Sequence, residues 1–321
     1  MNDVKTKSSA TAYYRLHLQG SDFAPRHWGN WLAAGLLWLF SLLPLPLSRL
    51  IGALIGLLLM AANAKRRNIV AINLKLCFPE LSEQTRKQML RRHYITSGQA
   101  HLDLGLLAWG SKWRLKRIFR VHGIEAYQKI AQADKPIILL APHSVGMNFG
   151  GSPLALYHPM FSMYKTQRSP VVNWLLNKGR MRFGCQLVAR DQGMRPVMRG
   201  LKQHIAFYYL PDEDLGPKHS IFAPFFGIQT ATLPSLCRLA ESTNALVVPV
   251  FTKLTWRGYE IYLRPPIENF PAGDKLADAT RMNEVLEEGI RIAPEQYLWT
   301  FKIFRTRPEG EASLYAEKKR N

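Results

Sequence analysis

The chain has 321 residues and a mass of 36.7 kDa, enough for one large globular domain or for one domain with an appendage. Its formal net charge is +20, and so positive a balance indicates an anionic partner such as nucleic acid, anionic lipid or an acidic protein. The cysteines form no CxxC or CxxH pair, which argues against a disulfide framework and a structural zinc site and fits a reducing compartment.

An N-terminal tail at residues 1–26 precedes a largely apolar segment at residues 27–64. No formal charge occurs at 27–48, a run long enough to cross a bilayer core of about 30 Å as a helix, although prolines interrupt its far end. A second uncharged run at 50–64 follows Arg49 and ends at the basic sequence KRR. We therefore expect an uncleaved membrane anchor at 27–64, which either crosses the bilayer fully or enters it as a hairpin.

Two other interpretations of this segment are the helical hairpin of a soluble core and a cleaved signal peptide. Apolar runs of about 15 residues are often core helices. The sequence ANA at 62–64 looks like a cleavage site, but the apolar region is much longer than that of a signal peptide. Five basic residues and no acidic one lie between Arg49 and Lys75, which favours an inner location for the domain that follows.

After the anchor, short β-rich runs alternate with helical stretches in one domain at 65–321. Ser82 is the expected N-cap of a helix over 83–107. This alternation predicts an α/β fold with a mixed or largely parallel sheet flanked by helices, and ligands of such folds lie outside the strand ends. The expected strands are 137–141, 161–164, 205–210 and 245–251, and helices are expected within 169–183, 233–243 and 278–292.

His143 directly follows the first of these strands and begins a loop that contains several glycines. Polar side chains at such a position usually face a cleft, where an imidazole that is neutral at pH 7 can act as a general base toward a hydroxyl. The alternative is an ordinary core histidine. The residue-type pattern alone leaves these two interpretations open.

Three acids, Asp212, Glu213 and Asp214, follow the strand expected at 205–210. Consecutive acids are usually a solvated turn, and a metal site at Asp212 and Asp214 lacks further ligands at suitable spacing. The position after a strand favours at least one of them lying in the same cleft as His143.

Basic residues dominate the stretch from 165 to 202, where the local charge balance is +8. Such a run is either a solvated face or a site for phosphorylated or carboxylated ligands, and its closeness to the expected cleft favours a site. No nucleic-acid-binding motif, GxSxG elbow, P-loop or GxGxxG sequence occurs, so nucleic acid and nucleotides are not expected ligands. The basic residues are Lys165, Arg168, Lys178, Arg180, Arg182, Arg190, Arg195, Arg199 and Lys202.

Three blocks of the sequence strongly resemble the bacterial lipid A late acyltransferases, which are lauroyl and myristoyl transferases. They are NLKLCFPELSEQ at 73–84, PDEDLGPKHSIFAPFFG at 211–227 and APEQYLWTFKIFRTRPEG at 293–310. The likeness extends from about residue 27 to 315, with the blocks in the family's order. That family belongs to the lysophospholipid-acyltransferase-like group, whose members have an α/β fold, an N-terminal membrane helix and a His-x4-Asp/Glu motif.

The resemblance implies transfer of a fatty acyl chain from acyl carrier protein to a hydroxyl of a Kdo-lipid IVA-type acceptor, an anionic glycolipid. The location it implies is the bacterial inner membrane, with the catalytic domain on the cytoplasmic face, and the mechanism needs no metal or cofactor. His143 falls on the motif histidine, while Arg180 and Asp212 fall on other polar site positions. The expected substrate-binding residues are Tyr164, Lys165, Arg168, Arg182, Arg190 and Asp214.

Asn148 occupies the position of the motif acid, where it can hydrogen-bond the imidazole but brings no charge. In serine proteases the same exchange of Asp for Asn in the triad costs about 10⁴ in turnover. Three hypotheses follow: an active acyltransferase in which Asp212 or another acid supplies the charge, a weakened or inactive lipid-binding homologue, and an acyltransferase for a lysophospholipid or another glycolipid.

Overall fold

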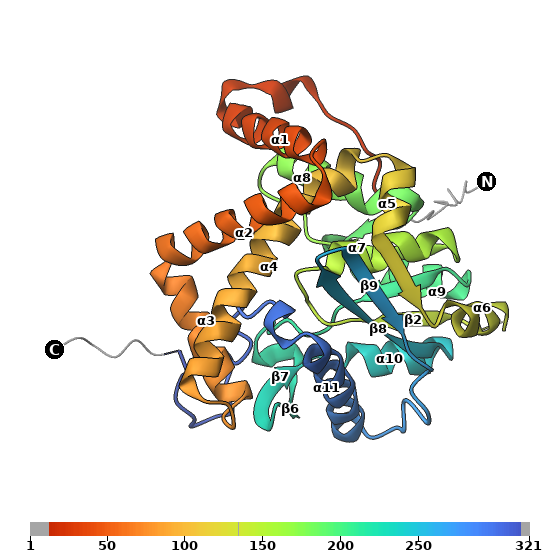
Figure 1. Cartoon of the computed structure of the whole chain (residues 1–321). Coiled ribbons are helices and arrows are strands. Elements are labelled where there is room, and N and C mark those ends of the chain that lie inside the picture. Colours follow the sequence, from red (N-terminus) through yellow and green to blue (C-terminus); the bar gives the residue numbers. More distant parts are fainter. Residues whose placement is uncertain (1–12, 134, 316–321) are drawn as a thin grey trace, which may run out of the picture.

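A seven-stranded sheet in the order β1-β9-β8-β2-β5-β3-β4 lies at the centre of the structure, a computed structural model that describes residues 13–133 and 135–315 (Figure 1). β8 and β9 pair antiparallel and the other neighbours pair parallel, so the sheet is mixed, as the sequence predicts. Its strands are β1 (Phe119–His122), β2 (Ile137–Leu140), β3 (Met160–Tyr164), β4 (Gln186–Ala189), β5 (Ala206–Tyr209), β8 (Leu246–Thr255) and β9 (Gly258–Leu263).

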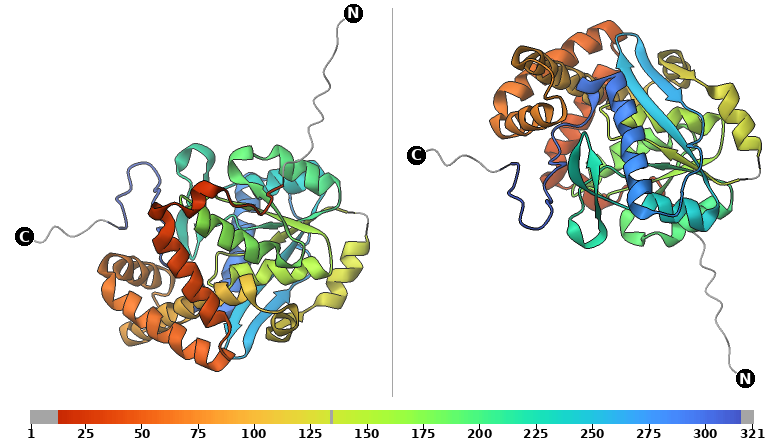
Figure 2. Two further views of the ribbon diagram at one scale, coloured as in Figure 1. Left: turned by 90° about the horizontal axis from the view of Figure 1, so that it is seen from above. Right: turned by 90° about the horizontal axis from the view of Figure 1, so that it is seen from below.

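Side chains of the central strands alternate between two cores, one on each face of the sheet. In β2, Ile137 and Leu139 enter one core and Ile138 and Leu140 enter the other. Because both faces are buried, the strand is an uninterrupted apolar run rather than an alternating one. Figures 1 and 2 show helices on both faces: α6 (Ile124–Gln132), α7 (Met147–Gly151) and α8 (Pro170–Arg180) on one, and α9 (Arg195–Lys202), α10 (Ser235–Thr243) and α11 (Lys275–Ile292) on the other.

The four expected strands are confirmed as β2, β3, β5 and β8. Not predicted were the short edge strands β1 and β4, strand β9, and the antiparallel hairpin of β6 (Ile221–Phe225) and β7 (Ile228–Thr232). Helix α11 begins earlier than expected, because the Asp274 carboxylate accepts hydrogen bonds from the amides of Leu276 and Ala277 and caps it.

A group of helices at one side of the sheet comes from the N-terminal part of the chain (Figure 1). The long apolar segment is divided at Pro44 into two helices, and the second is long and apolar enough to cross a membrane by length and composition. Ser82 caps the longest helix as predicted, by accepting a hydrogen bond from the amide of Thr85. The helices of this group are α1 (Trp28–Ser41), α2 (Leu45–Ala62), α3 (Ala64–Cys77) and α4 (Glu83–Trp109), and the short α5 (Lys112–Ile118) that follows packs beside β1 and β9 (Figure 1).

Helix α2 packs closely along α4 through small residues. Ser48, Gly52 and Gly56 are spaced four residues apart and are buried against α4. A Cβ at Gly52 would lie 2.6 Å from the Cα of Gln99, and one at Gly56 would lie 2.0 Å from the carbonyl oxygen of Tyr94. The backbones therefore approach too closely for larger side chains, as in small-xxx-small helix pairs.

Arg49 lies in the interior of the protein rather than at the border of the apolar segment. Its side chain is completely buried and forms an ion pair with Asp103 of α4. Asp103 also accepts a hydrogen bond of 2.6 Å from the hydroxyl of Tyr259, whose ring stacks on Phe149 of α7. Because Arg49 is buried, it is not a flanking charge of the apolar segment, and it does not support the inner location expected for the domain that follows.

Candidate active site

His143 and Asp212 meet at the edge of the sheet because of the register of two parallel strands. Leu140, the last residue of β2, pairs with Tyr209, the last residue of β5. His143 lies three residues after Leu140, and Asp212 lies three residues after Tyr209. The two polar side chains therefore reach the same level at this edge of the sheet. This edge is where parallel α/β sheets place their ligands.

The carboxylate of Asp212 binds His143 at two points. One oxygen lies 2.6 Å from the ring Nδ1, and the other accepts a hydrogen bond of 2.8 Å from the main-chain amide of His143. Both side chains are largely buried, at 4% exposure for Asp212 and 14% for His143. With Nδ1 donating to the carboxylate, the lone pair of the neutral imidazole is on Nε2.

The same pair shifts the pKa values of both groups. Burial lowers the pKa of His143, but the charge and hydrogen bond of Asp212, together with the charge of Glu213, outweigh it, and the net pKa is raised above 6.5. For Asp212, burial favours the neutral acid, while the charge and hydrogen bonds of His143 hold its pKa below 3.8. Asp212 therefore stays ionised at neutral pH and supplies the negative charge that Asn148 lacks.

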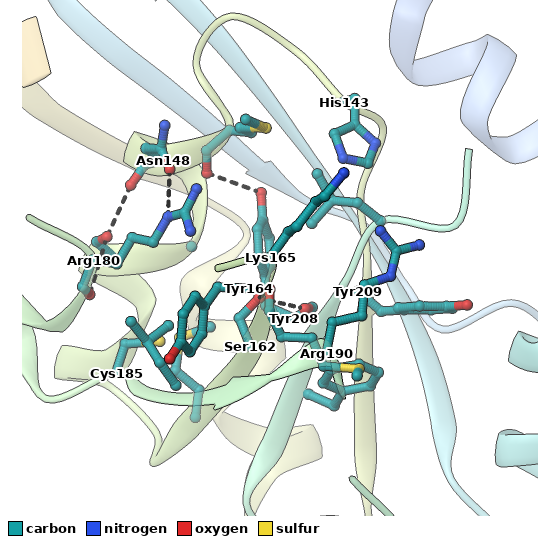
Figure 3. Close-up of a pocket in the computed structure, with 18 of the residues that line it drawn as sticks. His143, Asn148, Ser162, Tyr164, Lys165, Arg180, Cys185, Arg190, Tyr208 and Tyr209 are labelled. Atoms are coloured by element: carbon teal, nitrogen blue, oxygen red, sulfur yellow. Dashed lines mark hydrogen bonds between the residues drawn. The ribbon is translucent and has the colours of Figure 1, made fainter. Parts of the chain in front are cut away.

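A pocket of about 280 Å³ opens beside His143 and extends between the sheet and helices α7 and α8 (Figure 3). One wall follows the face of β3 that carries Met160, Ser162 and Tyr164, a length of roughly 13 Å. The lining combines apolar side chains with three cations: Lys165 and Arg190 lie toward His143, and Arg180 lies on the opposite side near Cys185 (Figure 3). The lining residues also include Met147, Asn148, Arg180, Cys185, Leu187, Arg190, Tyr208, Glu213 and Phe301.

Asn148 faces Arg180 instead of His143. The Nε of Arg180 donates a hydrogen bond of 2.8 Å to the side-chain oxygen of Asn148. Figure 3 shows this pair on one side of the pocket and His143 on the other. The hydroxyl of Ser152 donates to the carbonyl oxygen of Asn148, at 2.8 Å. His143 and the residue five positions after it in the motif, Asn148, thus have different partners.

The structure brings Tyr164, Lys165 and Arg190 to the lining of the pocket, together with His143, Asn148 and Arg180. Arg190 forms a 2.7 Å ion pair with Glu213, a residue that the sequence analysis did not include among the site residues. The second oxygen of Glu213 lies 4.0 Å from Nε2 of His143, too far for a hydrogen bond.

Three of the expected substrate-binding residues lie elsewhere. Arg168 is exposed and is not part of the lining. Arg182 donates hydrogen bonds to the carbonyl oxygens of Ala108 and Gly110 and so caps the end of α4. Asp214 is buried, and its carboxylate accepts hydrogen bonds from the amide and the hydroxyl of Thr306, at 2.6 and 2.8 Å. These two side chains serve internal contacts.

A C-terminal segment completes the site, although no residue in it was predicted to belong there. The amide of Leu298 donates to the carbonyl oxygen of His143, and the amide of Val145 donates to that of Gln296. The ring of Phe301 lies 5.6 Å from that of His143 and also lines the pocket. The segment belongs to the block 293–310, which carried part of the family resemblance, and that was the available signal.

The part of the chain that the structure describes contains no cluster of His, Cys, Asp and Glu side chains that could hold a metal ion. The charged groups at the pocket are the imidazole–carboxylate pair, the ion pair of Glu213 with Arg190, and the cations Lys165 and Arg180. Such a site can remove a proton from a hydroxyl and bind an anionic ligand.

Comparison with known families identifies the chain. A family model described as bacterial lipid A biosynthesis acyltransferase matches residues 19–306. The chain belongs to this family. It is therefore an acyltransferase, as the sequence blocks had indicated, and the predicted resemblance is confirmed.

Several known relatives of the acyltransferase cover nearly its whole length. It is 32% identical over 294 residues to the lipid A biosynthesis palmitoleoyltransferase of Escherichia coli K12, covering 91% of this chain and 95% of that one. It is 33% identical over 294 residues to the lauroyltransferase and over 297 residues to the myristoyltransferase of the same organism, covering 91% and 92% of this chain and 96% and 92% of theirs. These relatives are named for different acyl chains, so similarity alone does not assign a chain length to this acyltransferase.

Proposed function

We propose that the acyltransferase moves a fatty acyl chain from an acyl carrier protein thioester to a hydroxyl of a Kdo-lipid IVA-type acceptor. The observation that carries this proposal is the His143–Asp212 pair beside a pocket whose lining combines apolar side chains with the cations Lys165, Arg180 and Arg190. An imidazole oriented by a carboxylate suits the activation of a hydroxyl, and the apolar and cationic side chains suit the acyl chain and the charged parts of the substrates.

In the proposed reaction, Nε2 of His143 takes the proton of the acceptor hydroxyl while its oxygen attacks the thioester carbonyl. Asp212 stabilises the imidazolium that forms. The tetrahedral intermediate then collapses: the carbon–sulfur bond breaks, the ester remains on the acceptor, and the carrier thiolate receives the proton from His143. The residues of this chain supply the base, its orientation and positive charge for the anionic oxygen, and the step needs no cofactor.

The Asp212 contact supports an active enzyme over a weakened lipid-binding homologue. The weakened form rested on the absence of a carboxylate at position 148, and a buried carboxylate that binds His143 at two atoms can serve the same purpose. Asp212 lies only 4% exposed, so its charge acts on the imidazole with little screening by water.

The inner end of the pocket is proposed to hold the acyl chain. This end is formed by Met160 of β3, Leu187 of β4 and Cys185, which directly precedes β4. Burial raises the pKa of the Cys185 thiol to about 12, so this side chain stays neutral and behaves as a small apolar residue. A hydrocarbon chain that enters beside His143 would run along β3 and end near Cys185.

Residues 27–64 are proposed as the membrane-attachment segment and residues 65–321 as the acyltransferase domain, with the domain on the cytoplasmic face of the bacterial inner membrane. The face of α2 opposite α4 carries Leu47, Leu50, Leu54 and Leu58, which are 44% to 69% exposed. An exposed apolar face of this kind is suited to contact with lipid. Attachment by this face leaves the small residues of α2 packed on α4.

Acyl transfer with purified components tests the proposal. The protein is incubated with acyl carrier protein thioester and the tetra-acylated precursor, and in parallel with a lysophospholipid. Acylation of the precursor is expected, and His143→Ala is expected to lower turnover by about 10²–10⁴, the usual contribution of a general base. Acylation of the lysophospholipid alone would instead support the third hypothesis, and an unchanged rate for His143→Ala would reject His143 as the base.

A further inference from the structure

The side-chain amide of Asn148 interacts with Arg180 and not with His143. An arginine nitrogen is always a donor, so the hydrogen bond of 2.8 Å requires the oxygen of the amide to face it. The side-chain oxygen of Asn148 therefore accepts its hydrogen bond from Arg180. The Nδ1 and the main-chain amide of His143 both bind Asp212 instead.

The guanidinium of Arg180 lines the pocket without a neutralising carboxylate. Among the described residues, no Asp or Glu forms an ion pair with Arg180, since Asp212 binds His143 and Glu213 binds Arg190. Desolvation lowers the pKa of Arg180, which reflects the cost of keeping this charge away from water. A partly buried cation of this kind is stabilised by an anion that enters with a ligand.

We propose that Asn148 is a positioning residue that orients Arg180 without neutralising it, so that the guanidinium binds a phosphate group of a substrate. This inference rests on the proposed function, and it names the part of the substrate that the cationic side of the pocket recognises. The phosphate belongs either to the phosphopantetheine arm of the acyl donor or to the phosphorylated sugar of the acceptor. Lys165, which also lines the pocket, adds a second positive charge on the side of His143 (Figure 3).

An acid at position 148 would have the opposite effect to the one that the sequence motif suggests. With Asp212 in place, a carboxylate at 148 gains no contact with His143 and instead forms an ion pair with Arg180. That pair satisfies a desolvated cation, so the folded protein becomes at least as stable as before. The same pair removes the charge that a phosphate group would use.

Three variants and one matched control test the inference. Asn148→Asp neutralises Arg180, Asn148→Ala frees its orientation while keeping its charge, and Arg180→Gln removes the charge. Asn63→Asp makes the same chemical change at the N-cap of α3, where an Asp caps equally well and no pocket residue is touched. The thermal midpoint, its increase with inorganic pyrophosphate, and kcat and KM for each substrate are measured for all of them.

For Asn148→Asp we expect a thermal midpoint equal to or above that of the wild type, no protection by pyrophosphate, and a KM raised about tenfold to a hundredfold for one substrate, as for a lost charge-assisted hydrogen bond. The substrate whose KM rises identifies the source of the phosphate. Asn148→Ala should lie between Asn148→Asp and the wild type, and Asn63→Asp should match the wild type.

Two results overturn the inference: turnover of Asn148→Asp above that of the wild type, or wild-type protection by pyrophosphate in Arg180→Gln. Wild-type protein that transfers no acyl group to either lipid would contradict the proposed function. In that event the pyrophosphate measurement still decides the inference, because it needs no reaction.

Discussion

Asp212 holds His143 through both the imidazole and the main chain, with one carboxylate oxygen on each. The carboxylate therefore fixes the loop after β2 as well as the tautomer of the ring. Substitution of Asp212 by Asn would keep the shape but remove the charge that stabilises the imidazolium.

Asp212→Asn is expected to lower kcat strongly, and the serine-protease value of about 10⁴ sets the upper range. Single-turnover acyl transfer measures the change. Asn148→Ala serves as the comparison, because its side chain does not touch His143. Equal losses of kcat in the two variants would contradict the assignment of the carboxylate role to Asp212.

The acid side of the pH–rate profile should report the pKa of His143. A general base must be neutral, so kcat/KM is expected to fall as the pH drops through a pKa above 6.5, which Asp212 raises. In Asp212→Asn, burial is no longer opposed by this carboxylate, and the acid limb should move to lower pH. A limb that stays at the same pH in Asp212→Asn would show that another group titrates.

The length of the transferred chain should respond to the size of residue 185. Cys185→Phe places a large ring at the inner end of the pocket and is expected to shift the product toward shorter chains, whereas Cys185→Ala should leave the chain length unchanged or longer. Mass spectrometry of the product from mixed acyl donors measures the shift. Met160→Phe at the same level of the pocket should act in the same direction. Unchanged chain lengths in both phenylalanine variants would contradict the chain path.

Removal of one partner of the buried Arg49–Asp103 pair should destabilise the fold. Arg49→Met leaves a buried carboxylate without its cation and is expected to lower the free energy of unfolding by about 3–5 kcal/mol. Arg49→Met with Asp103→Leu should recover most of that loss. Lys87→Met, which removes an exposed ion pair with Glu83, should have no measurable effect. Chemical denaturation in detergent measures these differences, and a single variant as stable as wild type would contradict the coupling.

The exposed leucines of α2 should determine membrane binding. The triple variant Leu50→Asp, Leu54→Asp, Leu58→Asp is expected to lose sedimentation with anionic lipid vesicles, because charged side chains replace the face that contacts lipid. Its thermal midpoint should stay close to that of the wild type, since these positions are not part of the core. Lys129→Asp on α6 provides a surface control that should still bind vesicles. Full binding by the triple variant would reject this face as the attachment surface.

Sequence reasoning could predict the strand-end histidine and the acid cluster, because periodicity locates strands and parallel strands deliver their ends to one edge. It could not predict the partner of Asn148, since Arg180 is 32 residues away and reaches it only through the packing of α8 on α7. The local charge run also could not separate Arg180, which lines the pocket, from Arg182, which caps α4. Such differences depend on the direction of a side chain within one turn of helix.

The apolar pattern of α2 likewise predicted an anchor but not its second face. A hydropathy window averages over all side chains of a helix. In the structure, exposed leucines lie on one side of α2, and glycines with a buried arginine lie on the other. Only the tertiary contact with α4 distinguishes the two.

The burial of Arg49 has a practical consequence for the production of a detergent-free form. Deleting residues 1–62 would remove Arg49, the cation that pairs with Asp103, while Asp103 would still accept the hydrogen bond of Tyr259. The deletion would also expose the surface of α4 that carries glycines. A water-soluble variant should therefore keep the backbone of α2 together with Ser48, Gly52 and Gly56, and replace the outward leucines by polar residues. Helix α2 can be resurfaced, but its removal would leave Asp103 without its cation and the glycines of α4 uncovered.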